Sequence, residues 1–310
     1  MLQEPIIEPV SPAELEADLK NARFVRNTNK GNNQIYDFSA ADAPRLMQEV
    51  GRLREISFRM AGGGTGKSVD IDKYDVSDIP FRQLIVWNPQ EKEILGGYRY
   101  IHCKYLPQNQ DGTRYLATSH MFHFSDEFIH EYFPQTIELG RSFVQPIYQS
   151  SRAGAKTLYA LDNLWDGLGS LVVDNPDLRY FFGKVTMYTN FNQTARDYIL
   201  GFWKKYFKGS EKLIYAYNPI QIGLSEADCD KIFTTGDLQE DYKILVRKVR
   251  ELGVNIPPLV NAYMTLSPSM RSFGTAINDE FGEVEETAIL INLHDLYEKK
   301  AARHVSTYKK

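Results

Sequence analysis

The chain has 310 residues, of which 43% are apolar and 25% charged, and these values are ordinary for a globular protein with a hydrophobic core. A net charge of −4 provides no basic field for nucleic acid, which disfavours that class of partner. The two cysteines, Cys103 and Cys229, lie far apart and suggest neither a disulfide framework nor a metal site. We expect one domain over residues 1–310, with a lead-in (1–20), a core (21–295) and a C-terminal tail (296–310).

The N-terminal segment carries acidic residues early and has no basic stretch followed by an apolar one, so it does not look like a signal peptide. No window approaches 18 uninterrupted apolar residues, and a membrane-spanning helix is therefore not expected. Both observations favour a cytoplasmic protein.

The first third of the chain alternates short helices and strands. Apolar residues recur with helical spacing between residues 41 and 59, and a polar NKGNN turn separates two short apolar runs. The predicted elements are a helix at 12–20, strands at 22–28 and 34–38, and a helix at 41–59.

The remainder begins with a strand pair around the turn Asn88–Glu91 and ends with a second pair around Asp279–Gly282. Between them, strands and helices alternate. The predicted strands are 82–87, 93–105, 115–124, 136–146, 179–188, 270–278 and 285–293, and the predicted helices are 156–173, 193–207 and 238–252. This order is too irregular for a barrel or a doubly wound sheet and predicts an α/β (α+β) fold, with a mixed sheet of six or seven strands and helices on both faces.

Residues Ala61–Ser68 loosely satisfy the Walker A pattern, in which backbone N–H groups hold phosphates. Such a loop needs a buried strand before it and a helix after it. Here a charged helical segment precedes it, and an Asp-rich segment that ends at a proline follows. We therefore interpret it as a flexible glycine loop and not as a nucleotide site.

Four short pieces place charged groups in apolar surroundings, and two of them come early in the chain. Arg54 and Phe58 are four residues apart, on one face of the predicted helix. Asp72 and Asp75 follow in the loop beyond it. Taken singly, each has an ordinary explanation, since helix arginines and loop acids usually face water.

The other two pieces lie in predicted strands. Arg99 follows Gly96-Gly97-Tyr98, and Glu138 and Arg141 flank Gly140 within an apolar strand. Arg99 could cap a sheet edge, and Glu138 could pair structurally with Arg141. Together, however, several ionic groups in apolar elements are costly unless they pair or carry out chemistry. The four pieces thus indicate a candidate active site.

In their order, these pieces resemble those of acyl-homoserine-lactone synthases, a group with the GNAT fold. The sequence is more similar to the hemolysin-like GNAT N-acyltransferases that make ornithine lipids and glycine lipids in bacteria. The similarity covers about residues 20–295 and includes three further segments, Asn163–Gly167, Asn175–Gly183 and Ile256–Tyr263.

The resemblance implies a largely antiparallel GNAT sheet with a V-shaped opening beside strand 136–146, which admits an acyl-phosphopantetheine arm. Backbone N–H groups near Phe143 and Val144 would bind the arm. The family's phosphate-binding turn corresponds to residues 149–155, where Gln149 and Gly154 remain but Arg152 replaces the first glycine. That departure weakens the case for the pyrophosphate of coenzyme A and favours the single phosphodiester of acyl carrier protein.

The implied reaction transfers a long-chain fatty acyl group, 3-hydroxylated or not, from acyl carrier protein to the amine of glycine or ornithine. Glu138 is the candidate general base, directly or through water, with Arg141 beside it. Arg99 or Arg54 would clamp the acceptor carboxylate. Asp72 and Asp75 would either orient those arginines or bind the acceptor ammonium, and Phe58 would line the acyl groove. No permanently bound cofactor is expected, and a lipid product implies peripheral contact with the inner membrane.

His120 and His123 are close in sequence, but residues three apart on a strand point to opposite faces and nothing nearby completes a ligand set, so no metal is expected. Two alternatives to the main hypothesis stay open. One is a coenzyme A-dependent N-acetyltransferase of a small amine. The other is a non-enzymatic, hemolysin-like lipid-binding protein, for which the sequence offers little.

Overall fold

The computed structural model describes residues 3–107, 116–149 and 155–310. The chain forms two compact units, and each is built from separate stretches of sequence. The first unit consists of Met1–Ala117, Pro134–Arg179 and Glu298–Lys310, and the second consists of Thr118–Phe133 and Tyr180–Tyr297. The expectation of a single domain over residues 1–310 stays a prediction.

The first unit contains an antiparallel sheet with strands in the order β1-β2-β3-β4-β6. The tight turn between β3 and β4 follows from Asn88, whose side-chain oxygen accepts hydrogen bonds from the N–H groups of Gln90 and Glu91 at 2.9 and 3.2 Å. The strand bounds are β1 Arg23–Asn27, β2 Gln34–Phe38, β3 Arg82–Asn88, β4 Glu93–His102 and β6 Thr136–Val144.

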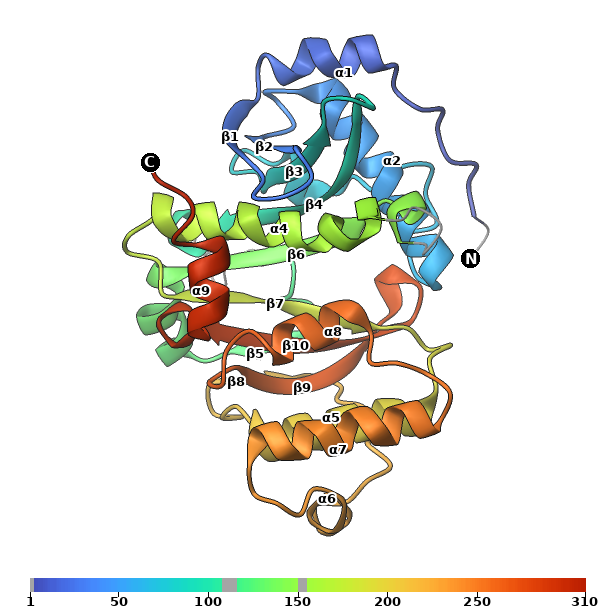
Figure 1. The fold of residues 1–310 in the computed structure, drawn as a ribbon, viewed down its shortest axis with the longest axis vertical. Coiled ribbons are helices and arrows are strands. Elements are labelled where there is room, and N and C mark those ends of the chain that lie inside the picture. The colour runs from blue at the N-terminus through green and yellow to red at the C-terminus, as the bar shows by residue number, and fades with distance from the viewer. Residues whose placement is uncertain (1–2, 108–115, 150–154) are drawn as a thin grey trace. The chain divides into compact units, whose positions relative to one another are not determined.

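Helices cover both faces of this sheet (Figure 1). The long helix α4 packs against the face that carries Leu84, because a Cβ atom on Gly167 would lie 2.9 Å from that side chain. Helix α2 lies on the opposite face, where Arg54 reaches Gln83. The helices are α1 Pro12–Leu19, α2 Pro44–Ala61, α3 Lys73–Val76, α4 Ala155–Asp174 and α9 Glu298–His304.

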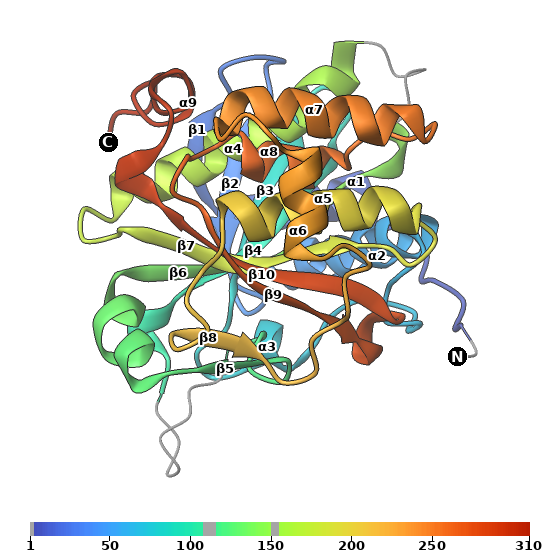
Figure 2. The ribbon, with the colours of Figure 1, turned by 90° about the horizontal axis from the view of Figure 1, so that it is seen from below.

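The second unit contains three antiparallel strands in the order β7-β10-β9, and a separate antiparallel pair, β5-β8. Helices α5 to α8 lie on one side of the three strands, and the β5-β8 pair lies on the other (Figure 2). The strands are β5 Phe122–Phe124, β7 Tyr180–Met187, β8 Ile214–Ala216, β9 Arg271–Asn278 and β10 Val284–Asn292. The helices are α5 Gln193–Tyr206, α6 Glu226–Ile232, α7 Leu238–Glu251 and α8 Pro258–Met264.

These elements confirm the predicted fold class of a mostly antiparallel sheet with flanking helices. One predicted strand, 115–124, is wrong in extent: of its described residues, 116–124, only Phe122–Phe124 form a strand, and a turn precedes them. Helices α3, α6, α8 and α9 were not predicted. Among the helices in the described part of the chain, none combines the length and apolarity needed to cross a membrane.

Candidate functional site

Strands β4 and β6 approach each other closely at one point, and two glycines make this possible. A Cβ atom on Gly96 would lie 2.4 Å from the carbonyl oxygen of Phe143, and one on Gly97 would lie 3.0 Å from that of Leu84. No side chain fits at the first distance. Gly96 is therefore required by the pairing of β4 with β6, while Gly97 is in tight contact with the neighbouring strand β3.

Next to these glycines, β6 contains one residue more than β4, which is a β-bulge. Arg99 pairs with Gly140 and Gly97 with Phe143, so that Tyr98 alone faces Arg141 and Ser142. Arg141 has a left-handed backbone with φ of 48°, uncommon for a residue other than glycine. A non-glycine residue held in this region is often found at functional sites.

The strand register places the candidate residues of β4 and β6 on one face. Residues 97, 99 and 101 alternate onto the same face of β4, and their partners are Phe143, Gly140 and Glu138. Glu138 and Arg99 therefore share a face, with Gly140 between them. The Arg99 side chain passes close to Gly140, where a Cβ atom would be in ordinary contact with Arg99 Nε at 3.5 Å.

The acid-rich loop after α2 presents its carboxylates to this face. Asp72 and Asp75 form a capping box around α3: the Asp72 side chain accepts from Tyr74 N at 2.9 Å, and Asp75 accepts from Asp72 N at 3.1 Å. Further back in the loop, Asp70 N donates to the carbonyl of Gly51 in α2 at 3.1 Å. The loop is thus fixed at both ends of the acidic segment.

Arg54 forms the interior of an ionic network and is fully enclosed. Its Nη1 lies 3.2 Å from Asp75 Oδ2 and donates to the Asp70 carbonyl at 3.4 Å, and its Nη2 donates to Gln83 Oε1. Gln83 in turn donates to Asp75 Oδ1 at 3.0 Å. The guanidinium is therefore occupied by groups of the protein itself.

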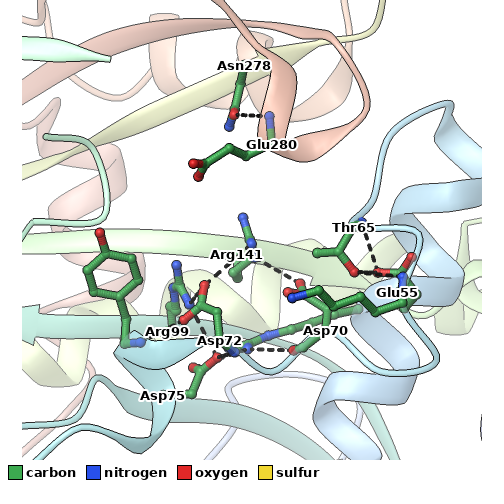
Figure 3. A network of polar contacts seen from close by, with 12 residues as sticks. Glu55, Thr65, Asp70, Asp72, Asp75, Arg99, Arg141, Asn278 and Glu280 are labelled. Carbon is green, nitrogen blue, oxygen red and sulfur yellow. Dashed lines mark hydrogen bonds and ion pairs between the residues drawn. The ribbon is translucent and has the colours of Figure 1, made fainter. Parts of the chain in front are cut away.

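Arg99 and Arg141 extend the network outward (Figure 3). Arg99 Nη1 lies 2.8 Å from Asp72 Oδ2 and 3.3 Å from Asp75 Oδ2. Arg141 Nε lies 2.8 Å from Asp70 Oδ2, and its Nη2 lies 3.5 Å from Asp72 Oδ2. Asp72 and Arg141 are the members with partly exposed side chains, at 25% and 13%. The network thus contains three arginines and three aspartates, with its open edge at Asp72 and Arg141.

The charges of this network shift one another's pKa values. Burial raises the pKa of Asp75, but the positive charges of Arg54 and Arg99 outweigh burial and lower that pKa to about 2. Burial lowers the pKa of Arg99, and the surrounding aspartates reverse this and raise it. For Arg54, burial dominates and lowers the pKa, yet a guanidinium stays protonated in proteins. Asp75 is accordingly a carboxylate at neutral pH.

Glu138 is 1% exposed, and its Oε2 accepts a hydrogen bond from Ala117 N at 3.2 Å. Phe58 is also buried and lies one helical turn beyond Arg54. The structure therefore brings Arg54, Asp72, Asp75, Arg99 and Arg141 into direct contact. It places Glu138 on the same sheet face as Arg99.

The residues expected to hold the acyl donor lie at the end of β6. The Val144 carbonyl accepts hydrogen bonds from Ser57 Oγ at 3.3 Å and from Gln149 Nε2 at 2.6 Å, while Phe143 is buried opposite Gly97. Gln149 thus contacts the end of β6, and its role in binding the donor stays a prediction. Arg152 and Gly154 lie outside the described residues.

The glycine loop that resembles a Walker motif is occupied by a side chain of the protein. Glu55, fully buried on α2, accepts hydrogen bonds from Thr65 N, Thr65 Oγ1 and Gly66 N. These contacts fix the loop, which the sequence had suggested to be flexible. Sequence analysis missed Asp70, Gln83 and Glu55. The sequence feature that could have identified them is their closeness to the recognised motifs, as Glu55 directly follows Arg54.

Within the residues that the structure describes, no group of three or more His, Cys, Asp or Glu side chains is arranged to hold a metal ion. In the second unit, His120 Nε2 lies 3.4 Å from Asn278 Oδ1, and Glu280 N donates to the same oxygen at 3.2 Å. The second histidine of the pair, His123, stacks on Tyr215 with ring centroids 4.6 Å apart.

Comparison with known proteins gives three findings. Residues 53–159 match the family model described as an acetyltransferase (GNAT) domain. Two proteins named glycine N(alpha)-acyltransferase align along nearly the whole chain. That of Bacteroides thetaiotaomicron is 57% identical over 305 residues (98% of this chain, 90% of the relative), and that of Phocaeicola vulgatus is 53% identical over 307 residues (99% and 94%). Among solved structures, the acyl-homoserine-lactone synthase LasI is similar over 92% of this chain and 96% of its own, with a TM-score of 0.40 and 13% identity.

Proposed function

Because this chain belongs to the same family as these two bacterial acyltransferases, and is an N-acyltransferase with a GNAT domain, we propose that it joins a fatty acyl group to the α-amino nitrogen of glycine. The observation that carries the proposal is the 57% identity over 98% of the chain to a protein named for that reaction. The ionic network beside β4 and β6 supports it, since it offers cationic groups to an acceptor carboxylate.

In the proposed reaction, the neutral amine attacks the carbonyl carbon of an acyl thioester. A C–N bond forms and the C–S bond breaks, so the products are an N-acyl amino acid and a free thiol. The amine of a free amino acid is mostly protonated at neutral pH, and one proton must leave the nitrogen before or during attack. A positioned base typically contributes about 10²–10⁴ in rate to such a step.

Glu138 is the proposed base. It is the buried carboxylate on the same face of the sheet as Arg99, and it is two residues from Gly140, the cross-strand partner of Arg99. Two residues along a strand span about 7 Å, so the backbone positions of the two groups lie within the length of a small amino acid. The Ala117 N–H donates to Oε2 and helps to fix the orientation of the carboxyl group.

Arg141 and Arg99 are the proposed partners of the acceptor carboxylate. Arg141 lies at the open edge of the network, and Arg99 is directly behind it, bound to Asp72 and Asp75. Arg54 was an alternative for this role, but its guanidinium is enclosed and bound to protein groups. We assign to Arg54 the orienting of Asp75, and to Phe58 the lining of the acyl groove.

The donor is proposed to be an acyl-phosphopantetheine thioester on acyl carrier protein, with acyl-coenzyme A as the alternative. Gln149 at the end of β6 would contact its phosphate region, together with Arg152 and Gly154, and the N–H groups of Phe143 and Val144 would bind the pantetheine. Entry of this arm beside β6 stays a prediction, as does contact of the protein with a membrane that receives the product.

The test combines purified protein with 3-hydroxyacyl carrier protein or acyl-coenzyme A and with glycine, ornithine or alanine, and detects products by mass spectrometry. We expect N-acylglycine from the carrier-protein donor, and thiol release that depends on glycine. Thiol release of equal rate without any amine would contradict the proposal.

Glycinamide provides a matched acceptor, because it keeps the amine and lacks the carboxylate. Loss of a charge-assisted hydrogen bond costs about 1.5–3 kcal/mol, so we expect kcat/KM for glycinamide to be about 10- to 100-fold below that for glycine. Equal values for the two acceptors would remove Arg141 and Arg99 from acceptor binding. A larger rate with acyl-coenzyme A than with the carrier protein would assign the donor to coenzyme A.

A further inference from the structure

Glu55 is a fully buried carboxylate without a substrate-binding role so far. Its Oε2 accepts from Thr65 N at 3.1 Å and from Thr65 Oγ1 at 2.7 Å, and its Oε1 accepts from Gly66 N at 2.8 Å and from Arg59 Nε at 2.7 Å. Successive backbone N–H groups in a glycine-rich turn form a concave anion site. In this chain a side chain of the preceding helix fills that site.

The shape of the loop depends on this carboxylate. Gly64 and Gly66 have left-handed backbones, with φ of 99° and 75°. A Cβ atom on Gly64 would lie 3.1 Å from Glu55 Oε1, a tight contact, and its φ of 99° is one that residues with a side chain rarely adopt. The glycines of the Walker-like motif are therefore explained by an internal anion, without a nucleotide.

The loop then runs back along α2 towards the ionic network. A Cβ atom on Gly51 would lie 2.5 Å from Val69 and 2.7 Å from Ile71, so these residues pack directly on the helix backbone. Asp70 lies between them, 2.8 Å from Arg141, and Asp72 follows, 2.8 Å from Arg99. Between the Glu55 contact at Thr65 and Asp70 there are only four residues, which limits how far the acids can move independently.

We propose that Glu55 is a positioning residue for acyl transfer. By binding the N–H groups of the glycine loop it fixes the place of Asp70 and Asp72, and through them the two arginines, Arg141 and Arg99, that meet the acceptor. The inference rests on the proposed function as far as the role of those arginines is concerned. Glu55 itself touches no substrate, so its effect should appear in the use of the amine and not in the use of the thioester.

The kinetic test compares Glu55→Gln with Glu49→Gln. Glu49 is a matched control, because it is a buried acid on the same helix that pairs with Arg52 and accepts from Val10 N but does not contact the glycine loop. Displacements of about 1 Å around a reacting centre can cost up to 10²-fold in rate. We expect Glu55→Gln to raise KM for the amine by about tenfold or more and to leave KM for the acyl donor within about twofold. Glu49→Gln should leave both KM values near the wild type.

A milder variant keeps the test decisive if Glu55→Gln folds poorly. Thr65→Val removes the hydroxyl donor and retains the N–H donor of the same residue, so its effect on KM for the amine should have the same direction and a smaller size. A general loss of stability would lower the amount of active enzyme without a selective change in one KM. The inference would be overturned if Glu55→Gln and Thr65→Val both kept the wild-type KM for the amine. It would also be overturned if Glu49→Gln changed this KM as much as Glu55→Gln does.

Amide hydrogen exchange provides a measurement that needs no turnover. In Glu55→Gln we expect faster exchange across residues 62–75, including the amides of Thr65, Gly66 and Asp70, whereas Glu49→Gln should affect the segment around Val10. Unchanged exchange in residues 62–75 of Glu55→Gln would contradict the inference, even if the wild type acylated no amine. Absence of acylation by the wild type would contradict the proposed function alone.

Discussion

Arg54 illustrates why the charged residues of the first unit were recognisable but their roles were not. A buried arginine is costly unless its partners are arranged with good geometry. Helical spacing predicted its position, and the nearby acids suggested partners. Its complete enclosure depends on Gln83 and on the carbonyl of Asp70, which belong to other elements. No local pattern indicates such contacts, so the choice between Arg54 and Arg99 for the acceptor could not be made from sequence.

Replacing Arg54 by alanine should destabilise the protein strongly. Removal of Arg54 leaves the buried Asp75 with Arg99 but without the closer of its two ion-pair partners, and the loss of one partner of a buried ion pair costs about 3–5 kcal/mol. Urea denaturation measures the change. Arg45→Ala on the same helix is the control: its side chain is 55% exposed and pairs with Glu14, so its loss should cost less than about 1 kcal/mol. Similar losses for both variants would contradict the structural role of Arg54.

Replacing Glu138 by glutamine should abolish most turnover without unfolding the protein. The amide keeps an oxygen that can accept from Ala117 N, but it cannot take a proton from the amine. We expect kcat to fall by about 10²–10⁴ while the melting temperature changes little. Glu93→Gln, on the adjacent strand β4, should retain activity. An active Glu138→Gln enzyme would remove Glu138 from the mechanism.

The lowered pKa of His102 predicts how the stability of the protein varies with pH. Burial, helped by Lys104, lowers the pKa of His102 to about 4, from an ordinary value of 6.5. The unfolded chain therefore binds a proton at higher pH than the folded one. The contribution of His102 to stability is complete above pH 6.5 and is lost as pH falls towards 4.

Urea denaturation between pH 4 and 7 tests this expectation. In His102→Gln, the decline of stability on acidification should become shallower, because a titrating group is removed. His294→Gln, which changes an exposed histidine, should leave the pH dependence as in the wild type. A His102→Gln protein with the wild-type slope would show that other groups cause the decline.

At the scale of elements, the pairing of β4 with β6 determines the site, and its glycines lead to a prediction. Gly96→Ala should destabilise the protein by roughly 2 kcal/mol or more, because the added Cβ would meet the Phe143 carbonyl at 2.4 Å and the backbone must move. Gly140→Ala is the contrasting variant. Its Cβ meets Arg99 Nε at an ordinary 3.5 Å, so both stability and KM for the amine should change little. Thermal unfolding measures the stability of both variants, and steady-state kinetics measure KM for the amine. A Gly96→Ala protein as stable as the wild type would contradict the prediction for Gly96.

Most strands were predictable because apolar runs and turn residues determine them locally, as for Gln34–Phe38, which matches β2 at both ends. The β-bulge at Arg141 was not predictable, since an extra residue in one strand becomes apparent only when that strand is compared with its partner. Short helices were missed for another reason. Helix α8 begins at Pro258, directly after Pro257, and two consecutive prolines suggest a loop. Helix α9 has few apolar residues, so that its burial depends on contacts with α4.

At the scale of the whole molecule, helix α9 returns the chain to the first unit after the second is complete. Its contact with α4 is close: a Cβ atom on Gly169 would lie 2.0 Å from the His304 carbonyl. His304 Nδ1 lies 2.8 Å from the buried Asp166, which also accepts from Asn29 N at 2.8 Å. The helix therefore connects α4 with the turn after β1.

Deleting residues 298–310 should destabilise the first unit, because Asp166 loses its buried histidine partner and the surface of α4 around Gly169 becomes exposed. We expect a fall in melting temperature of several degrees, corresponding to a few kcal/mol. Deletion of only Lys309 and Lys310, both exposed, should have little effect. Equal melting temperatures for the long deletion and the wild type would contradict the role assigned to α9.

The return of the chain through α9 also bears on biosynthesis. A ribosome makes residues 180–297 before residue 298, so the second unit has its entire sequence available while the first still lacks the helix that covers Gly169. Domains generally fold as units during synthesis. The half that contains Glu138 and the arginines is thus the one whose last helix, α9, is translated after the other half is complete in sequence.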